Sequence, residues 1–168
     1  SKIVNRENKE TGLLFGDAAT ATWLSDKVDW SFGSPVFKTD SSERNSLFVD
    51  EEKTLKMNGR RIFNFASIEV PEQINFFLEK NNLSHNDIDL FCLHQGSLSI
   101  LDKISKKYPD IENRFIKEMS FTGNTVSSSI PLLLENKIIN KKIKKILICG
   151  FGVGLSIATN IIERIEND

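Results

Sequence analysis

The sequence predicts an α/β protein in which a layered mixed sheet packs against helices. Short apolar runs bounded by turn residues, at 88–93 and 143–149, are typical of buried strands. The segment around Pro71 instead carries apolar residues at helical spacing. Polar or glycine-rich residues follow the apolar runs, which is where layered α/β proteins build their sites. These three observations predict strands and helices along the chain, with a site where strands end.

Residues 13–24 contain Phe15-Gly16-Asp17-Ala18-Ala19, whose small members let another backbone approach closely. Two interpretations stay open: tight packing within a sheet, and one wall of an active site. Residues 28–37 have a composition typical of a strand, and we expect them to pair with a strand at 20–24. We expect a polar loop over 38–45.

The clearest helix of the chain follows a turn at 57–63. Pro71 is typical of a first helical turn, so we expect the helix to begin close to it. The apolar residues recur at i, i+4, i+7 and i+8 and predict one buried face, formed by Val70, Ile74, Phe77 and Leu78. Asn81-Asn82 ends this helix. A polar turn at 84–87, which can form a short helical turn, precedes the buried strand at 88–93.

Further helices and strands complete the prediction. A helix over 98–108 has one apolar face, formed by Leu101, Ile104 and Tyr108. Pro109 ends it, and we expect another helix over 111–117. A helix over 125–138 contains Pro131, which either kinks the helix or lies in its first turn. The last two strands are predicted at 143–149 and 155–162.

The composition is that of an ordinary soluble domain. The 168 residues suffice for one domain with a core, and 39% of them are hydrophobic and 27% charged. A net charge of −1 favours neither a nucleic-acid nor a membrane partner. No apolar run approaches the roughly 20 residues of a membrane helix. Cys92 and Cys149 lie inside apolar runs, so we expect core thiols in a reducing, cytoplasmic environment.

Three short pieces stand where buried elements meet turns: His94-Gln95-Gly96-Ser97, Gly123-Asn124-Thr125 and Gly150-Phe151-Gly152-Val153-Gly154. A neutral His ring has one N–H to donate and an Asn amide has two, so together they can hold a thioester carbonyl. Neither can attack that carbonyl. The alternative interpretation of each piece is structural: a hydrogen-bonded His at a strand end, a Gly-Asn turn and a glycine-kinked strand.

Five segments carry a family resemblance that spans nearly the whole chain. They are Phe15-Gly16-Asp17-Ala18-Ala19, residues 57–63, His94-Gln95-Gly96-Ser97, Gly123-Asn124-Thr125 with Ser129-Ile130-Pro131, and Gly150-Phe151-Gly152-Val153-Gly154-Leu155. In order and spacing they resemble the FGDGA, M-x-G-x-x-V-F, HQAN, GNT-x-x-x-SIP and GFGGGL motifs of β-ketoacyl-acyl-carrier-protein synthase III, in the thiolase superfamily. The resemblance implies a thiolase-like fold of two similar halves, of which this chain is the C-terminal half.

The resemblance also implies a reaction, the decarboxylative Claisen condensation of an acyl thioester with a malonyl thioester. His94 and Asn124 would be the catalytic pair that stabilises the enolate. The other implied substrate contacts are Phe151 and Gly152 against the acyl chain, and Ser97 and Arg60 near the pantetheine arm. The substrates would be acyl-CoA or acyl-carrier-protein thioesters, and the resemblance implies no metal and no other cofactor.

The implied partners follow from the same family. Its nucleophilic Cys lies in the first half, so the chain would work with its own N-terminal half, in a homodimer, and would be inactive alone. Ser99 and Asn64 replace an Arg and a Lys that help to dock the acyl carrier protein. Lys106 and Lys107 remain on the predicted helix and are the expected docking residues. Whether the chain is an excised domain or a natural split subunit stays open.

Two other functions stay open at this point. Some relatives on this fold transfer acyl groups to a hydroxyl or an amine without forming a carbon–carbon bond, and the altered docking residues suit such a role. The missing nucleophile equally suits a non-catalytic subunit that completes the site of a partner.

Overall fold

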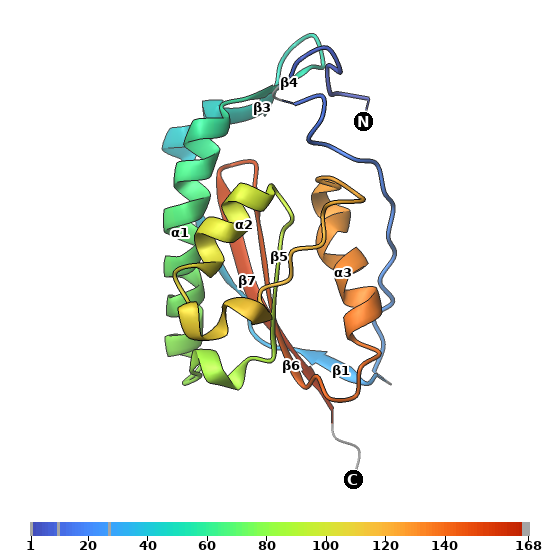
Figure 1. Cartoon of the computed structure of the whole chain (residues 1–168), viewed down its shortest axis with the longest axis vertical. Helices are drawn as coiled ribbons and strands as arrows, with labels where there is room; N and C mark the ends of the chain where they lie inside the picture. Colours follow the sequence, from blue (N-terminus) through green and yellow to red (C-terminus); the bar gives the residue numbers. More distant parts are fainter. Residues whose placement is uncertain (1, 10, 27, 166–168) are drawn as a thin grey trace.

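The computed structural model describes residues 2–9, 11–26 and 28–165 (Figure 1). Its α-helices are α1 (Gly59–Lys80), α2 (Leu98–Ser105) and α3 (Ser129–Lys137). Short 3-10 helices are η1 (Ser41–Ser46), η2 (His85–Asp87), η3 (Pro109–Arg114) and η4 (Val126–Ser128). The strands are β1 (Trp30–Phe32), β2 (Val36–Thr39), β3 (Leu47–Val49), β4 (Leu55–Met57), β5 (Leu90–Leu93), β6 (Lys145–Gly152) and β7 (Ser156–Arg164). Among these described residues, no helix is long and apolar enough to cross a membrane.

A mixed sheet of five strands forms the centre of the molecule, as the sequence predicts. β5 pairs in parallel with β6, and β6 pairs antiparallel with β7. β1 and β2 both pair antiparallel with β7, at different points along that strand. Figure 1 shows α1 and α2 on one side of the sheet and α3 on the other. β3 and β4 form a separate antiparallel pair beside the start of α1.

Successive side chains of β5 alternate between two parts of the core, one on each face of the sheet. Phe91 and Leu93 are buried in the larger cluster, which α1 and α2 cover, whereas Cys92 is buried in a smaller cluster that includes Leu133 of α3. Successive strand side chains point to opposite faces, so the residue after Leu93 returns to the α3 face. That residue is His94, and its side chain is therefore directed toward α3.

α1 confirms the predicted apolar face but not the predicted start. Asn58 caps the helix, because its side chain accepts a hydrogen bond from the Arg61 amide at 3.1 Å. Pro71 thus lies deep inside the helix, and the prediction that it marks the first turn is wrong. Phe65 and Ala66, one turn and more before Pro71, are already buried on the core side. Their burial offsets the roughly 3 kcal/mol that an interior Pro costs a helix.

The predicted strand at 20–24 is also wrong. These residues run without pairing to any described strand, and Trp23 and Leu24 are 87% and 71% exposed. The segment expected to pair with them forms β1 and β2, which pair with β7 instead. The nine-residue β7 offers a long free edge, so both short strands find their hydrogen bonds there. The loop expected over 38–45 contains the end of β2 and most of η1.

Two helix predictions differ from the structure for local reasons. α2 ends at Ser105 rather than at Tyr108, although Tyr108 is buried as expected. The segment 111–117 is not an α-helix, because η3 is followed by an extended stretch whose Ile116 amide donates to the Phe91 carbonyl at 3.1 Å. This stretch covers the free edge of β5. Pro131 lies in the first turn of α3, which is one of the two predicted alternatives.

Gly16 confirms the predicted close approach of two backbones. Its amide donates to the Asn124 carbonyl at 3.0 Å, and a Cβ added to Gly16 would lie 1.8 Å from the Thr122 carbonyl oxygen. We therefore predict that Gly16→Ala lowers the free energy of unfolding by about 2 kcal/mol, as overpacking does. Gly59→Ala is the matched control, since nothing lies within 4 Å of a Cβ there. Urea unfolding measures both, and equal stabilities would contradict the expected backbone contact.

Candidate active site

His94 is positioned by the parallel pairing of β5 with β6. Its amide donates to the Cys149 carbonyl at 2.9 Å, one step beyond the Leu93–Cys149 register pair. The chain then turns, and the Gly96 amide donates back to the His94 carbonyl at 2.9 Å. Phe151, near the end of β6, meets the His94 ring edge-on at a centroid distance of 5.2 Å. The carboxyl ends of two parallel strands thus supply two side chains of one site.

The His94 ring is neutral at pH 7. Its Nδ1 atom forms a 2.8 Å hydrogen bond with the Ser129 hydroxyl of α3. Burial of the ring lowers the pKa of His94 from 6.5 to about 4, and a weaker interaction with the Val126 backbone opposes the shift. A neutral imidazole carries a single N–H, so the ring can offer one hydrogen bond without carrying charge.

Asn124 is held by its backbone and by its side-chain oxygen. It is 7% exposed, and its amide donates to the Leu14 carbonyl at 2.9 Å. Its Oδ1 atom accepts a hydrogen bond from the Val126 amide at 2.9 Å, which fixes the orientation of the side-chain amide. Nδ2 then donates one hydrogen to the Gly96 carbonyl, over a long 3.4 Å. The second Nδ2 hydrogen has no partner among the described residues and is available to a ligand.

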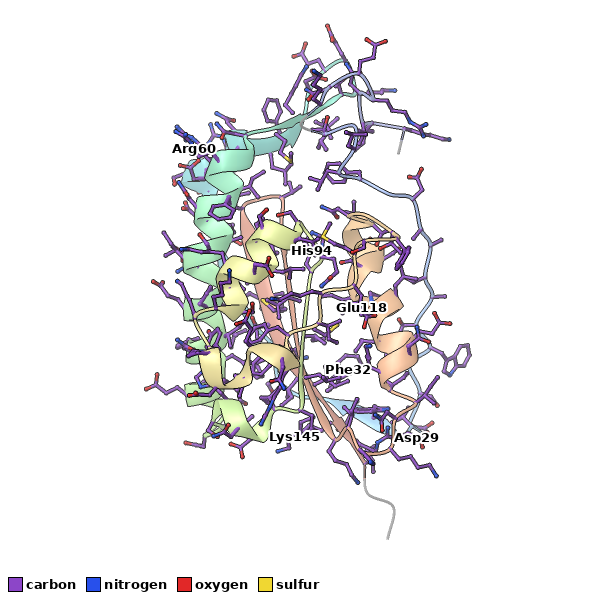
Figure 2. All side chains as sticks on the ribbon, viewed as in Figure 1. Asp29, Phe32, Arg60, His94, Glu118 and Lys145 are labelled. Atoms are coloured by element: carbon purple, nitrogen blue, oxygen red, sulfur yellow. The ribbon has the colours of Figure 1, made fainter. Side chains whose placement is uncertain are left out.

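Both candidate donors lie next to Gly96. Asn124 donates to its carbonyl, and a Cβ added to Gly96 would lie 3.7 Å from the Nε2 atom of His94. Nε2 of His94 and Nδ2 of Asn124 therefore border the same residue, although their motifs are 30 positions apart in the sequence. Figure 2 shows His94 between α2 and α3, at the end of the sheet where β5 stops. The geometry supplies two neutral hydrogen-bond donors beside one aromatic ring.

The glycines at the end of β6 have different surroundings. Nothing lies within 4 Å of a Cβ at Gly152, so among the described residues this glycine faces open space. Gly154 has φ +142°, and a Cβ there would lie 2.2 Å from the Ser156 hydroxyl oxygen. Glycine is thus required by this chain at position 154, where the turn into β7 begins.

Ser97, Arg60, Lys106 and Lys107 form no hydrogen bond or ring contact with His94 among the described residues. Ser97 accepts a hydrogen bond from the Ile100 amide at 3.2 Å and so caps α2. Arg60 is exposed at the start of α1, away from His94 (Figure 2). Lys106 and Lys107 are exposed, but the prediction that they lie on the helix is wrong. α2 ends at Ser105, so Lys106 is its C-cap and Lys107 lies in the following turn. The chain turns at this point, and Tyr108 is buried beyond the turn.

Both cysteines are core thiols, as predicted. Cys92 and Cys149 are fully buried, and burial raises the pKa of each thiol to about 12. Thiols with so high a pKa are almost entirely protonated at pH 7, and the thiolate is the nucleophilic form. Neither residue can therefore serve as the nucleophile for a thioester. Over the described residues, no three His, Cys, Asp or Glu side chains gather as metal ligands.

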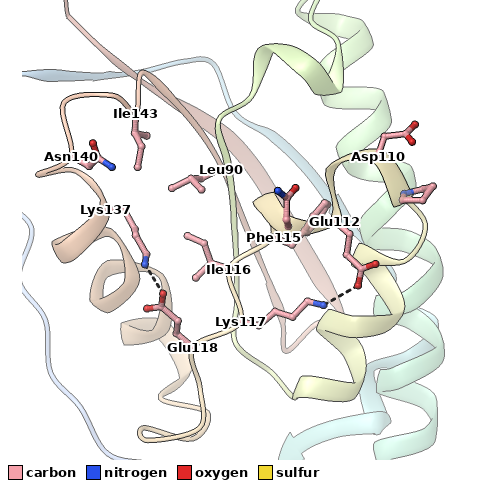
Figure 3. Close-up of a pocket in the computed structure, with 12 residues that line it drawn as sticks. Leu90, Asp110, Glu112, Phe115, Ile116, Lys117, Glu118, Lys137, Asn140 and Ile143 are labelled. Carbon is pink, nitrogen blue, oxygen red and sulfur yellow. Dashed lines mark hydrogen bonds and ion pairs between the residues drawn. The ribbon is translucent and has the colours of Figure 1, made fainter.

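One groove of the structure lies at a different place from His94 and Asn124. It measures about 930 Å³ and follows the outer edge of β5, where Leu90 and Ile116 form its floor (Figure 3). Two ion pairs lie among its lining residues, Lys117 with Glu112 and Lys137 with Glu118. A second groove of about 870 Å³ lies between α3 and the residues 19–25 and 28–32. Neither of these two grooves is lined by His94 or Asn124.

Sequence reasoning missed two residues that hold this region together. Ser129 reaches His94 from α3, and its place in the Ser-Ile-Pro segment gave no sign of that contact. Gln95 is 2% exposed and satisfies its whole side chain with backbone: Nε2 donates to the Leu93 and Ile116 carbonyls, and Oε1 accepts from the Glu118 amide. A Gln among turn residues is ordinarily exposed, so only its place beside His94 could have singled it out.

The lowered pKa of His94 predicts how the protein responds to acid. Between pH 6.5 and about 4 the unfolded chain binds a proton on His94 that the folded chain does not. The stability that His94 contributes is therefore present above pH 6.5 and is lost as the pH falls toward 4, by about 3 kcal/mol at 1.36 kcal/mol per pKa unit.

An NMR titration of the His94 ring, assigned by its loss in His94→Gln, should give a midpoint near 4. The stability advantage of the parent protein over this variant should also shrink across the same range. A midpoint near 6.5 would contradict the burial of the ring.

Comparison with known proteins gives the chain its family. The family model of 3-oxoacyl-[acyl-carrier-protein (ACP)] synthase III C terminal matches residues 78–164. The β-ketoacyl-[acyl-carrier-protein] synthase III of Streptococcus agalactiae serotype III is 37% identical over 180 residues, which cover 97% of this chain and 56% of the relative. The corresponding protein of Lactococcus lactis subsp. lactis is 35% identical over 186 residues, with the same coverage.

Solved structures confirm the predicted fold. The β-ketoacyl-[acyl carrier protein] synthase III of Thermus thermophilus superposes with a TM-score of 0.84 at 27% identity, over 99% of this chain and 56% of that chain. Another 3-oxoacyl-(acyl-carrier-protein) synthase III superposes with a TM-score of 0.81 at 28% identity. The match covers 96% of this chain and 57% of that chain. The chain spans about half the length of these relatives. It belongs to the 3-oxoacyl-[acyl-carrier-protein] synthase III family and corresponds to the C-terminal part of its members.

Proposed function

We propose that this chain is the C-terminal half of an enzyme that condenses an acyl thioester with a malonyl thioester, with loss of CO₂. The observation that carries the proposal is that two neutral donors, Nε2 of His94 and Nδ2 of Asn124, border Gly96 at the end of β5. The names of the relatives describe synthases, which favours condensation over acyl transfer to a hydroxyl or an amine.

The two donors suit the difficult species of this reaction. When the malonyl thioester loses CO₂, the electron pair of the broken carbon–carbon bond forms an enolate whose charge rests on the thioester oxygen. Hydrogen bonds from His94 and Asn124 to that oxygen would lower the barrier, because such donors are worth most where water is excluded. The enolate carbon then attacks an acyl group held on a Cys, a carbon–carbon bond forms, and the thiolate leaves.

The nucleophilic Cys belongs to the N-terminal half in this proposal. Cys92 and Cys149 are excluded by their burial and raised pKa. Apolar side chains close in sequence to Asn124 and to Phe151 are exposed: Phe121 is fully exposed, Val126 is 57% exposed and Val153 is 67% exposed. Exposed apolar surface of this kind marks an interaction site. Its position supports a second half that covers this face and encloses the site.

We infer that the substrates are acyl-CoA and a malonyl group on CoA or an acyl carrier protein, and that the complete enzyme is a homodimer. For carrier docking, the support is a basic cluster formed by Lys103, Lys106 and Lys107, all exposed around the end of α2. An acidic carrier surface would meet this cluster through flexible point charges rather than through the planar fork of an Arg. Such binding weakens strongly with salt.

The catalytic proposal predicts a selective defect in the complete enzyme, formed by this chain and its N-terminal half. His94→Ala or Asn124→Ala should lower kcat of condensation by about 10²–10³, as removal of one oxyanion donor does. Decarboxylation of the malonyl thioester should fall equally, whereas intact mass should still show acylation of the Cys.

His85→Ala is the matched control, because His85 contacts Asn75 and Tyr108 rather than this site. Condensation at the parent rate in both site variants would refute the proposed function.

The docking proposal predicts a substrate-dependent defect. In the double variant Lys106→Glu, Lys107→Glu, kcat/KM should fall for carrier-linked malonyl substrate and stay unchanged for malonyl-CoA. The difference should be largest at low salt, where exposed charges are least screened. Lys80→Glu, at the exposed end of α1, is the control. Equal losses with both substrates would indicate disturbed folding, and no loss with either would place the carrier elsewhere.

A further inference from the structure

We propose that Ser129 is a positioning residue that sets the tautomer of His94, keeping the ring proton on Nε2. The inference rests on the proposed function of His94 as a donor, and extends it to a residue of α3 that does not touch the substrate. Two hydrogen bonds of the Ser129 hydroxyl carry it, one with the His94 ring and one with the backbone of Gln95.

The direction of these bonds follows from the Gln95 amide. A backbone N–H can only donate, and it donates to the Ser129 hydroxyl oxygen at 3.4 Å. The hydroxyl hydrogen is then free to point at Nδ1 of His94, 2.8 Å from the same oxygen. If Nδ1 instead donated to the hydroxyl, the hydroxyl hydrogen would need another acceptor. Within the part of the chain that the structure describes, no other acceptor is hydrogen-bonded to this hydroxyl.

The tautomer decides what the ring can do at the site. With Nδ1 as acceptor, the single proton of the neutral ring resides on Nε2, the atom that borders Gly96 and the Asn124 amide. Nε2 then donates to an oxyanion held there. In the other tautomer Nε2 would present a lone pair to that oxyanion, and the contact would be repulsive. The Ser129 hydroxyl thus selects the tautomer in which the His94 ring stabilises the oxyanion.

The fold holds the hydroxyl in place. Ser129 is 4% exposed and begins α3, so its backbone is fixed by the helix. Leu133, one turn later, is buried with Cys92 of β5, the strand that ends at His94. The packing of α3 against β5 therefore fixes the distance between the hydroxyl and the ring.

The test compares Ser129→Ala with the matched control Ser128→Ala in the complete enzyme. Ser128 is also buried, and its hydroxyl donates to the Ala18 carbonyl at 3.3 Å, so the control removes a hydroxyl that does not touch His94. With ¹⁵N-labelled histidine, the His94 nitrogens, identified by their loss in His94→Gln, report the tautomer directly. We expect the parent and Ser128→Ala to show the proton on Nε2, and Ser129→Ala to show a mixture of both tautomers.

The kinetic readout should follow the spectrum. Ser129→Ala should lower kcat of condensation roughly tenfold, less than the loss of the donor itself, with KM for the malonyl substrate unchanged. Ser129→Cys, which keeps the volume and a weaker S–H donor, should restore part of both readouts and serves as the second variant if Ser129→Ala does not fold.

A parent ring protonated on Nδ1, or unchanged ¹⁵N shifts in Ser129→Ala, would overturn the proposal even if His94→Ala abolishes condensation. If His94→Ala leaves condensation intact, the proposed function fails, and the tautomer spectra still decide the role of Ser129.

Discussion

The parallel pairing of β5 with β6 is the constraint on which the rest of the site depends. Its register places Leu93 opposite Cys149, and one further hydrogen bond ties the His94 backbone to the end of this ladder. The same pairing brings Phe151 against the His94 ring. Alternation along β5 then directs His94 toward α3. A shift of one residue in this register would turn the ring to the α1 and α2 face, away from its partners.

A second constraint is that both candidate donors, His94 and Asn124, are uncharged. The ring lies where burial lowers the pKa of His94 to about 4, and Asn124 has no charge to lose. A permanent cation at this point would hold an anionic substrate in the ground state as well as in the transition state, and uniform binding of this kind does not raise kcat. In the proposed reaction, neutral donors whose orientations are fixed by Ser129 and Val126 would strengthen their hydrogen bonds as the thioester oxygen gains charge.

The sequence was sufficient for the elements whose pattern is local. The apolar runs predict β5, β6 and β7, and the helical spacing predicts the buried face of α1. Predictions failed where distant packing decides the outcome. Pro71 is carried inside α1 by the burial of residues before it, and Ile116 joins the edge of β5 rather than a helix.

The candidate site shows the same division. His94 and Asn124 stand in recognisable turns, so both could be identified as candidate site residues from the sequence and from family motifs. The contact of Ser129 with His94 joins residues 35 positions apart and depends on how α3 docks. Gln95 likewise acquires its partners only when the chain from residue 116 to 118 passes the end of β5. No local pattern marks such contacts.

The most direct test of this account is a crystal structure of the complete enzyme with an unreactive analogue of the malonyl thioester. We predict that one oxygen, the thioester carbonyl oxygen of the analogue, lies within about 3.2 Å of both Nε2 of His94 and Nδ2 of Asn124. A carbonyl oxygen bound by neither atom, or by only one of them with the other facing away, would contradict the central claim that these two residues form a single oxyanion site.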